Sequence, residues 1–534
     1  MLYLPYAALL ASVVSTMSTP QVQNKHLKLD FSVLRGDSRS SATQDGYAKV
    51  VGGDNYTTLY IANKKNYYSS TLKIGSNGNQ NSVLVDTGSS DLWIMASDVS
   101  CFIQFRSSKR SIEDFPVFAH HHLREFESDG STPTEKIAKR AYNATSFASS
   151  TPAATPWQWS ANPSVCTSLG SFNTADSGSF KVNTTAPDFY VEYGDGSYAS
   201  GIWGTDYVAV GGLNVSDVSI AIANKTSSEV GVLGIGLTWL EVTSIFNDTQ
   251  PAYTYENFPV RLKSTGVINK VAYSLYLNDT NASSGTVLFG AVDHAKYSGQ
   301  LQTVPIINTR PQIRKNPIAF YVGLDSVTLG DSKQNISIAN DTLYALLDSG
   351  TTLTYLPYTY VDAIAASLNG KVTNSEFYEV SCKYNTSSAF VTYNLSGVQI
   401  NAPLSDLILS NEKGTKCYLG LVSSTSGRPV AILGDSFLRH AYVVYNLEDY
   451  EISLAPVKYS NSENIEAISS TVPSAVKAPG YSSTSFPSFI STHPLISTTP
   501  LSTAGLKSSA ESKAYYFAKS LLIGIVGVSL IFVL

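Results

Sequence analysis

The stretch Val83-Leu-Val-Asp-Thr-Gly-Ser-Ser90 occurs twice along this chain, the second time as Ala345-Leu-Leu-Asp-Ser-Gly-Thr-Thr352. In each copy an apolar run ends in Asp, which is followed by a hydroxyl residue, Gly and further hydroxyl residues. Each copy is also followed by a second motif of two apolar residues and Gly, which reads Val232-Leu-Gly234 in the first half and Ile432-Leu-Gly434 in the second. Such a repeat predicts two homologous lobes, each giving one Asp-containing loop to a shared cleft.

The two halves differ mainly by one insertion. In the first half the Asp lies 148 positions before the Gly of the second motif, whereas in the second half this interval is 86 positions. The difference of 62 nearly equals the 64 residues between Cys101 and Cys166. No hydrophobic periodicity holds within residues 102–165, so we expect a long exposed loop there.

The rest of the body reads as β-structure. Between about residues 67 and 456, short β-branched and aromatic runs alternate with Gly, Asn and Ser turns, and helical periodicity is scarce. We therefore expect an all-β fold of two lobes with a cleft between them, the N-terminal lobe at 66–275 and the C-terminal lobe at 276–456. The net charge of -5 comes from 36 basic and 41 acidic residues without a basic stripe, which argues against nucleic-acid binding.

Two Asp side chains on facing loops predict acid–base chemistry. The glycines Gly88 and Gly350 let the backbone approach closely and donate N–H groups. Because neighbouring carboxylates cannot both ionise readily, the pair Asp86 and Asp348 keeps one proton over an acidic range. The ionised member can then activate a water, while the protonated member donates to a carbonyl group. The sequence thus predicts amide hydrolysis that needs no metal, cofactor or covalent intermediate.

These motifs resemble those of a known family, the pepsin-like aspartic proteases. The family's paired signatures are similar to Val85-Asp-Thr-Gly-Ser-Ser-Asp-Leu-Trp93 and Leu347-Asp-Ser-Gly-Thr-Thr352. Its flap is similar to Tyr193-Gly-Asp-Gly-Ser197, and a further motif is similar to Ile432-Leu-Gly-Asp-Ser-Phe-Leu-Arg439. The resemblance covers about residues 67 to 456.

The resemblance implies a role for each matching residue. Hydroxyl hydrogen bonds of Thr87 and Ser349 would brace the two loops, and the hydroxyl after each loop glycine would bond an outer carboxylate oxygen. Tyr193 would close over a bound peptide with its hydroxyl near Trp93. The implied set comprises the catalytic pair Asp86 and Asp348, the supporting residues Thr87, Gly88, Ser89, Ser349, Gly350 and Thr351, and the flap or substrate-binding residues Tyr193, Gly194, Asp195 and Trp93.

Within this family, the long insertion, a Ser/Thr-rich stalk and a lipid-attachment signal resemble the fungal yapsin branch. Yapsins are cell-surface proteases that cut precursor and cell-wall proteins after Lys or Arg, singly or in pairs. A carboxylate at Asp195 would favour a basic substrate side chain, although Asp is also common as a plain turn residue. The alternatives are a broad-specificity pepsin-like protease and a catalytically silent, stalked cell-wall binding protein.

The N-terminus predicts export. Residues Leu2 to Val14 are mostly apolar and are followed by small residues, so we expect a signal peptide at 1–17. The polar segment 18–65 is expected to be a pro-segment, with Arg35, Arg39 and Lys49 as alternative ends.

The C-terminus predicts a lipid anchor. Residues 457–508 are rich in Ser, Thr and Pro and have few large apolar groups, which predicts an O-glycosylated stalk. Residues 509–534 contain a polar spacer and a terminal apolar run, a signal that is exchanged for a GPI lipid. The expected attachment residue is Ser508, with Gly505 as the alternative, and a tail-anchored helix is the other interpretation.

Glycosylation acceptors agree with this route. Many Asn-x-Ser/Thr sites on a chain with both end signals predict a glycoprotein at the outer face of the plasma membrane or in the cell wall. The acceptors are Asn55, Asn143, Asn183, Asn214, Asn224, Asn247, Asn278, Asn281, Asn335, Asn340, Asn385 and Asn394.

The insertion also carries two basic pairs, Lys109-Arg110 and Lys139-Arg140. They predict cleavage after Arg110 and Arg140, although exposed charges on an uncut loop are the alternative. Cleavage would leave a monomer of two disulfide-linked chains. The run His120 to His122 gives no preformed metal site, so we expect no metal.

The four cysteines allow two disulfides. The expected pairs are Cys101 with Cys166, which flank the insertion, and Cys382 with Cys417, which both lie in the second half.

Overall fold

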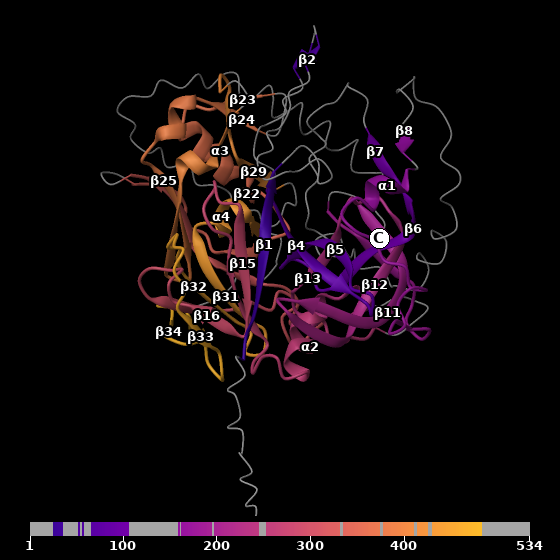
Figure 1. Ribbon diagram of the computed structural model, residues 1–534. Coiled ribbons are helices and arrows are strands. Elements are labelled where there is room, and N and C mark those ends of the chain that lie inside the picture. Colours follow the sequence, from indigo (N-terminus) through magenta and orange to yellow (C-terminus); the bar gives the residue numbers. More distant parts are fainter. Residues whose placement is uncertain are drawn as a thin grey trace, which may run out of the picture.

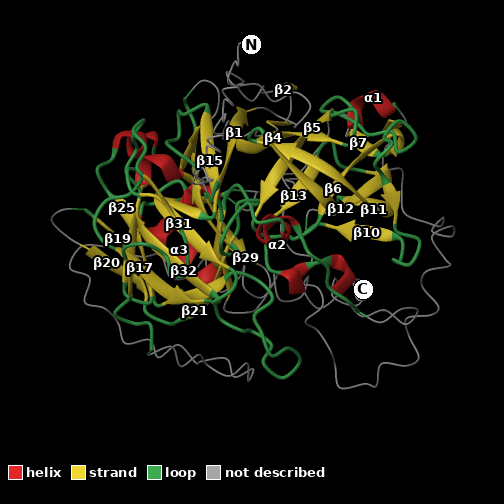
Figure 2. Ribbon diagram, turned by 60° about the horizontal axis from the view of Figure 1, so that its bottom comes forward, coloured by secondary structure: helices red, strands yellow, loops and turns green. Residues whose placement is uncertain are grey.

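The computed structural model describes residues 25–35, 52–53, 56–57, 66–105, 158–160, 162–194, 197–244, 252–331, 335–373, 377–410, 414–424 and 430–482. Strands dominate these residues, and the first and second halves form two bodies side by side (Figures 1 and 2). The expected all-β, bilobal fold is therefore confirmed. Among the described residues no helix is long and apolar enough to cross a membrane.

The N-terminal lobe places the first copy of the repeat between buried strands. Strand β13 (Gly231–Gly234) runs parallel to β5 (Asn79–Asp86), with Gly234 opposite Asp86, and antiparallel to β6 (Leu92–Cys101). All of β13 is buried, which suits a short apolar strand between two neighbours. The other elements of this lobe are β4 (Asn66–Ile74), β7 (Ile103–Phe105), β8 (Gln158–Ser160), α1 (Pro163–Cys166), β9 (Lys181–Val182), β10 (Phe189–Glu192), β11 (Tyr198–Val210), β12 (Leu213–Thr226), η3 (Thr238–Leu240), η4 (Val242–Ser244) and α2 (Phe258–Ser264).

The C-terminal lobe repeats this arrangement. Strand β30 (Val430–Leu433) runs parallel to β21 (Leu343–Leu347) and antiparallel to β22 (Thr354–Pro357). The second motif of the repeat therefore lies beside the first in both lobes. The other elements here are β18 (Tyr321–Leu324), β19 (Ser326–Gly330), β20 (Asn335–Ala339), α3 (Tyr358–Ser367), β23 (Lys371–Val372), β24 (Tyr378–Val380), η5 (Cys382–Thr386), β25 (Phe390–Leu395), β26 (Val398–Pro403), η6 (Leu404–Leu407), β27 (Ile408–Ser410), β28 (Cys417–Leu419), β29 (Leu421–Ser424) and α4 (Asp435–Leu438).

One sheet of 15 strands runs through both lobes. Its central strand is β1 (Leu27–Arg35), which pairs with β4 of the first lobe and with β15 (Ser284–Phe289). The alternating side chains Leu27, Leu29, Phe31 and Val33 are buried, as expected for a strand with one face on the core. The expected pro-segment thus contains a strand of the central sheet. Beyond β15 the sheet continues through β14 (Ala272–Tyr276), β31 (Ala441–Asn446), β32 (Glu451–Pro456) and β17 (Leu301–Pro305), and a two-residue hairpin pairs β2 (Gly52–Gly53) with β3 (Tyr56–Thr57).

The prediction that a stalk begins at residue 457 is wrong for residues 457–482, here called the C-terminal strap. In the strap β33 (Ile465–Ala467) pairs with β16 (Ala291–Asp293), and β34 (Ala475–Lys477) pairs with β17. Ile468 and Ala478 are buried against the second lobe. Backbone pairing and a few small apolar groups order a segment whose composition alone indicates disorder. The rest of the expected stalk, the GPI signal with Ser508 and Gly505, and the signal peptide lie outside the described residues.

Candidate active site

Asp86 is the last residue of β5, and the turn that follows holds its carboxyl group. The backbone N–H of Gly88 donates to Oδ1 at 2.7 Å, and the hydroxyl of Ser89 donates to Oδ2. The residue is only 5% exposed. A carboxyl group with two fixed donors cannot rotate freely, so its oxygens keep distinct positions.

Asp348 follows the last residue of β21 and has the same kinds of partner. The backbone N–H of Gly350 donates to Oδ1 at 2.8 Å, and the hydroxyl of Thr351 donates to Oδ2 at 2.6 Å. Asp348 is fully buried. The sequence repeat is therefore also a repeat of geometry.

The loop glycines show how closely the two carboxyl groups approach. A Cβ atom added to Gly88 would lie 2.5 Å from Oδ1 of Asp348. One added to Gly350 would clash in the same way with Oδ1 of Asp86. Each glycine therefore lies against the carboxyl group of the other lobe, and any side chain at either position would displace that group.

Four hydrogen bonds tie the two loops across the junction. The N–H of Ser349 donates to the Thr87 hydroxyl at 2.9 Å, and the N–H of Thr87 donates to the Ser349 hydroxyl at 3.1 Å. Each hydroxyl in turn donates to a backbone carbonyl on the other lobe, Thr87 to Leu347 and Ser349 to Val85, both at 3.0 Å. This arrangement fixes the separation of the lobes at the carboxyl pair.

Burial raises the pKa of Asp348 well above its ordinary value, and the charge of Asp86 raises it further. The hydrogen bonds from Thr351 and Gly350 act in the opposite direction. Neighbouring carboxyl groups of this kind titrate as a pair, and the pair holds one proton over a range of pH.

A third carboxyl group, that of Asp435, interacts electrostatically with the pair; its motif was noted in the sequence, but Asp435 was given no role. Asp435 is 1% exposed, and its Oδ1 has no hydrogen-bond partner among the described residues. Burial raises its pKa well above the ordinary value, Arg439 opposes this, and Asp348 and Asp86 add to it. An Asp at the start of an apolar helix, after Ile432-Leu-Gly434, was the available signal.

The expected flap residues lie where an aromatic cluster can support them. The Trp93 indole N–H donates to the Tyr193 hydroxyl at 2.6 Å, and their ring centres lie 6.5 Å apart. The Trp93 ring also packs near Phe189, which in turn makes an edge contact with Trp203. Gly194 continues the chain beyond Tyr193. Asp195 lies outside the described residues.

A buried acidic pair next to the first loop was also missed. Asp91 and Glu241 are 3% and 0% exposed. Asp91 accepts hydrogen bonds from the Tyr255 hydroxyl at 2.7 Å and the Val242 N–H at 3.0 Å, whereas Oε1 of Glu241 has no partner among the described residues. Burial raises the pKa of Asp91 to about 6 and that of Glu241 to about 10. Glu241 therefore stays protonated at neutral pH.

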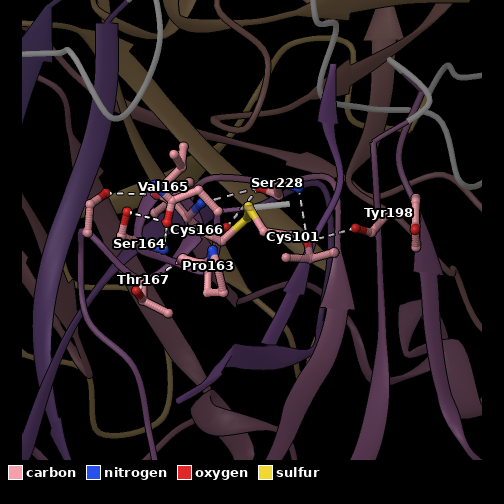
Figure 3. Close-up of a disulfide and its surroundings, with 12 residues drawn as sticks. Cys101, Pro163, Ser164, Val165, Cys166, Thr167, Tyr198 and Ser228 are labelled. Atoms are coloured by element: carbon pink, nitrogen blue, oxygen red, sulfur yellow. Dashed lines mark hydrogen bonds between the residues drawn. A yellow bond between two sulfur atoms is a disulfide. The ribbon is translucent and has the colours of Figure 1, made fainter. Parts of the chain in front are cut away.

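The two ends of the insertion, at Cys101 and Cys166, lie next to the strands that carry the flap. The Cα atoms of the Cys101–Cys166 disulfide lie 5.9 Å apart, and Figure 3 shows Tyr198 and Ser228 around it. The N–H of Phe102 donates to the Thr226 carbonyl at 2.8 Å, and the Thr226 hydroxyl donates to the carbonyl of Tyr198 at 2.8 Å. The Cys382–Cys417 disulfide is also present, so both disulfides join the expected pairs. Arg110, Arg140 and the His120 to His122 run lie outside the described residues.

The glycosylation acceptors divide by exposure. Two of the described acceptors, Asn278 and Asn394, are half-buried, and Nδ2 of Asn278 already donates to the Ser284 carbonyl at 3.1 Å. The exposed ones are Asn183, Asn214, Asn224, Asn281, Asn335, Asn340 and Asn385. Asn55, Asn143 and Asn247 lie outside the described residues.

The arrangement can perform general acid–base chemistry on a polar bond. The carboxyl groups of Asp86 and Asp348 lie close together, and the pKa of Asp348 is raised. An ionised carboxylate can take a proton from water while its protonated neighbour donates one to an oxygen. Among the described residues no group of three His, Cys, Asp or Glu side chains is placed to hold a metal ion.

Comparison with known proteins places this geometry in a family. Residues 67–457 match the eukaryotic aspartyl protease family. Aspartic proteinase 3 of Saccharomyces cerevisiae is 43% identical over 86% of this chain and 83% of its own length. Secreted aspartic protease 9 of Candida albicans is 39% identical over 86% of this chain and 89% of its own length. Aspartic proteinase yapsin-3 of S. cerevisiae is 39% identical over 86% of this chain and 78% of its own length.

Proposed function

The chain belongs to the eukaryotic aspartyl protease family and is an aspartic endopeptidase of the yeast yapsin and secreted aspartic protease type, and on this premise we propose that Asp86 and Asp348 are its catalytic pair. The observation that carries the proposal is the matched set of donors on the two carboxyl groups, a glycine N–H on Oδ1 and a hydroxyl on Oδ2 in each. These donors leave both groups oriented toward one shared reaction centre.

In the resting enzyme Asp348 carries the shared proton, because burial and the neighbouring carboxylate raise its pKa. Water between the groups gives a proton to Asp86 as its oxygen attacks the scissile carbonyl carbon, while Asp348 protonates the carbonyl oxygen. The resulting diol then loses a hydroxyl proton to Asp348. The amide nitrogen takes the proton from Asp86 as the C–N bond breaks, which restores the starting protonation.

The flap completes the site in this proposal. The Trp93 indole N–H fixes the Tyr193 hydroxyl, so the Tyr193 side chain has a defined resting position. Closure of such a hairpin over a bound peptide would exclude water other than the reacting one.

We extend the proposal to cleavage after Lys or Arg, singly or in pairs. Asp195 lies two positions after Tyr193 in the sequence, where its carboxylate would pair with a basic side chain and disfavour neutral ones. The competing proposal is a broad-specificity protease that prefers hydrophobic side chains, and the experiment below separates the two.

The proposed location is the cell surface, with a GPI lipid at Ser508 or Gly505 and precursor or cell-wall proteins as substrates. Support comes from the apolar runs at both ends of the sequence and from a relative named as a secreted protease. The exposed Asn acceptors can carry sugar without disturbing the core. Cleavage after Arg110 and Arg140 would leave two chains joined by the Cys101–Cys166 disulfide.

The test is cleavage of a peptide library at pH 4 to 7 by the purified ectodomain, with and without the inhibitor pepstatin. Asp86→Asn is the inactive comparison, and Asp98→Asn is the matched control because Asp98 is exposed on the neighbouring strand β6. Pepstatin-sensitive cuts after Lys and Arg, lost in Asp86→Asn and kept in Asp98→Asn, are expected. Cuts after Leu or Phe would discard the basic preference, and wild-type levels of cutting by Asp86→Asn would discard the catalytic pair.

A second variant isolates the specificity. Asp195→Asn keeps the size of the side chain and removes its charge. We expect kcat/KM for a basic peptide to fall by about tenfold, the value of one charge-assisted pair, with little change for a neutral peptide. Equal changes for both peptides would contradict the role of Asp195.

A further inference from the structure

We propose that Arg314 is a positioning residue that clamps together two segments, one from each lobe, that are bonded to the catalytic loops, an inference that rests on the proposed function. Its Nη2 donates to the backbone carbonyl of Ser244 at 2.8 Å, and its Cζ lies 4.5 Å from the centre of the Trp239 ring. Arg314 precedes β18 of the C-terminal lobe, whereas Ser244 ends η4 of the N-terminal lobe. One side chain therefore makes both a hydrogen bond and a cation–π contact across the lobe junction.

On the N-terminal side, the clamp grips a segment that is fastened to the first catalytic loop. The Ser90 hydroxyl donates to the Leu237 carbonyl at 2.7 Å, just before η3. The N–H of Gly236 donates to the carbonyl of Ser89 at 2.8 Å. Trp239 itself packs against the main core. Movement of this segment would therefore disturb the loop that carries Asp86.

On the C-terminal side, Arg314 lies in a loop that is held by hydrogen bonds between its own residues. The Arg314 N–H donates to the Arg310 carbonyl at 2.9 Å, and Nδ2 of Asn308 donates to the Arg314 carbonyl at 2.7 Å. The strand after this loop lies next to the second catalytic loop, because the N–H of Leu347 donates to the Phe320 carbonyl at 3.2 Å. Each end of the clamp is thus connected, through a short stretch of chain and a hydrogen bond, to the strand or loop that carries one catalytic aspartate.

Within the part of the chain that the structure describes, the guanidinium group of Arg314 contacts Ser244 and Trp239. Arg314 is half-buried and forms no ion pair among the described residues. The guanidinium plane suits the arrangement, since it can lie over a ring while an edge N–H points to a carbonyl. A lysine ammonium has no such plane and would keep the charge without the fixed geometry.

The clamp adds a link to the Thr87–Ser349 bonds, which hold only the two loops. Chemistry at the carboxyl pair depends on those inner bonds. The shared sheet joins the two lobes, and Arg314 adds a separate link from the loop before β18 to the end of η4. A peptide that touches both lobes well beyond the scissile bond should need the clamp. A short peptide that reaches only the carboxyl pair should not.

The test compares two peptides that share one cleavage sequence, one of about four residues and one of about eight residues, which spans roughly 26 Å when extended. The variants are Arg314→Ala and Arg314→Lys, and the matched control is Lys315→Ala, which removes an exposed charge from the same loop. For Arg314→Ala we expect KM of the long peptide to rise about fivefold, with kcat and the short peptide nearly unchanged. Arg314→Lys should resemble Arg314→Ala, and Lys315→Ala should resemble the wild type.

Equal losses for both peptides, or a fall in active-site titre without a change in KM, would reduce Arg314 to a merely structural role and overturn the proposal. A rise in KM of the long peptide for Lys315→Ala as large as that for Arg314→Ala would attribute the change to loss of charge alone. That result would also overturn the proposal.

A second measurement does not depend on activity. In a double-mutant cycle of Arg314→Ala and Trp239→Ala, the shift in unfolding temperature of the double variant should be smaller than the summed shifts of the single variants. Additive shifts would overturn the clamp. An inactive wild-type protein with a non-additive cycle would contradict the proposed function and leave the clamp standing.

Discussion

The Ser349 N–H donates to the Thr87 hydroxyl at 2.9 Å, and the Thr87 N–H donates to the Ser349 hydroxyl at 3.1 Å. The hydroxyl of each residue thus accepts a hydrogen bond from the backbone of the other across the lobe junction. Both side chains are buried. Loss of either hydroxyl leaves a buried N–H and a buried carbonyl without their partners, which is costly where water cannot replace them. The reciprocity explains why a hydroxyl residue follows Asp in both copies of the repeat.

Ser349→Ala should lower the free energy of unfolding by about 1–3 kcal/mol, because it leaves the Thr87 N–H unsatisfied in a buried site. It should also lower kcat, since the two carboxyl groups would no longer be held in register. Ser349→Thr is the control, because it keeps the hydroxyl and reproduces the residue of the first loop. Chemical denaturation and steady-state kinetics measure the two effects. An alanine variant as stable as the threonine variant would contradict this account.

Activity should fall as pH rises toward and beyond neutral. The raised pKa of Asp348 keeps one proton on the pair in acid, and loss of that proton removes the group that protonates the scissile carbonyl. At the acid end, protonation of both groups removes the base. The profile of kcat/KM against pH should therefore be bell-shaped, and unfolding temperatures at each pH separate titration from unfolding. Undiminished kcat/KM at strongly alkaline pH would exclude this mechanism.

The buried acids should make the fold more stable in acid than at neutral pH. The pKa values of Asp91, about 6, and Glu241, about 10, exceed their ordinary values of 3.8 and 4.5. The folded protein thus keeps protons that the unfolded chain releases, and stability declines as pH rises above about 4.

Glu241→Gln should reduce this decline, because an amide keeps the acceptor for the Tyr255 N–H and has no proton to lose. The variant should match the wild type near pH 4 and exceed it in unfolding temperature at pH 7. The exposed Glu256→Gln serves as control. Parallel curves of wild type and Glu241→Gln between pH 4 and 8 would argue against a neutral, buried Glu241.

Trp93→Phe should lower kcat/KM by about tenfold, because the Tyr193 hydroxyl loses the donor that fixes it. Tyr193→Phe removes the same bond from the other side. If the bond carries the effect, the double variant should be no worse than the poorer single variant. Independent, additive losses in a kinetic cycle would show that the two residues act separately.

A chain ending at Pro456 should be less stable than one ending at Ser482 by roughly 5–10 °C in unfolding temperature, because β33 and β34 and their buried contacts would be lost. The strap covers an apolar cluster that includes Val292, Leu301 and Tyr442. The chain ending at Ser482 retains the whole strap and is the control. Equal unfolding temperatures would show that the strap adds nothing to the fold.

The repeat predicted the bilobal fold and the convergence of Asp86 and Asp348, because a motif that recurs with the same flanking strands must recur in three dimensions. The strap was not predictable in this way. Its strands are three residues long, and it is ordered by backbone pairing and by contacts such as the 2.6 Å hydrogen bond from the Tyr481 hydroxyl to Glu451. Such contacts leave no periodic pattern.

The buried acids were missed for a different reason. Asp91 and Glu241 are 150 positions apart in the sequence. Asp91 lies in the first signature motif without an assigned role, and Glu241 lies in no motif. Only the packing of η3 and η4 against the first loop brings them together. The same holds for Arg314, whose partners Trp239 and Ser244 lie in the other lobe.

The disulfide at the root of the insertion has a consequence for how this protein can diverge. The Cα atoms of Cys101 and Cys166 are 5.9 Å apart, so the chain leaves and re-enters the lobe at nearly one point. Doubling the length of a loop with fixed ends costs only about 0.6 kcal/mol. Evolution, or a protein engineer, can therefore lengthen, shorten or replace the segment between these cysteines, even with a folded cargo domain, while the catalytic body keeps its shape.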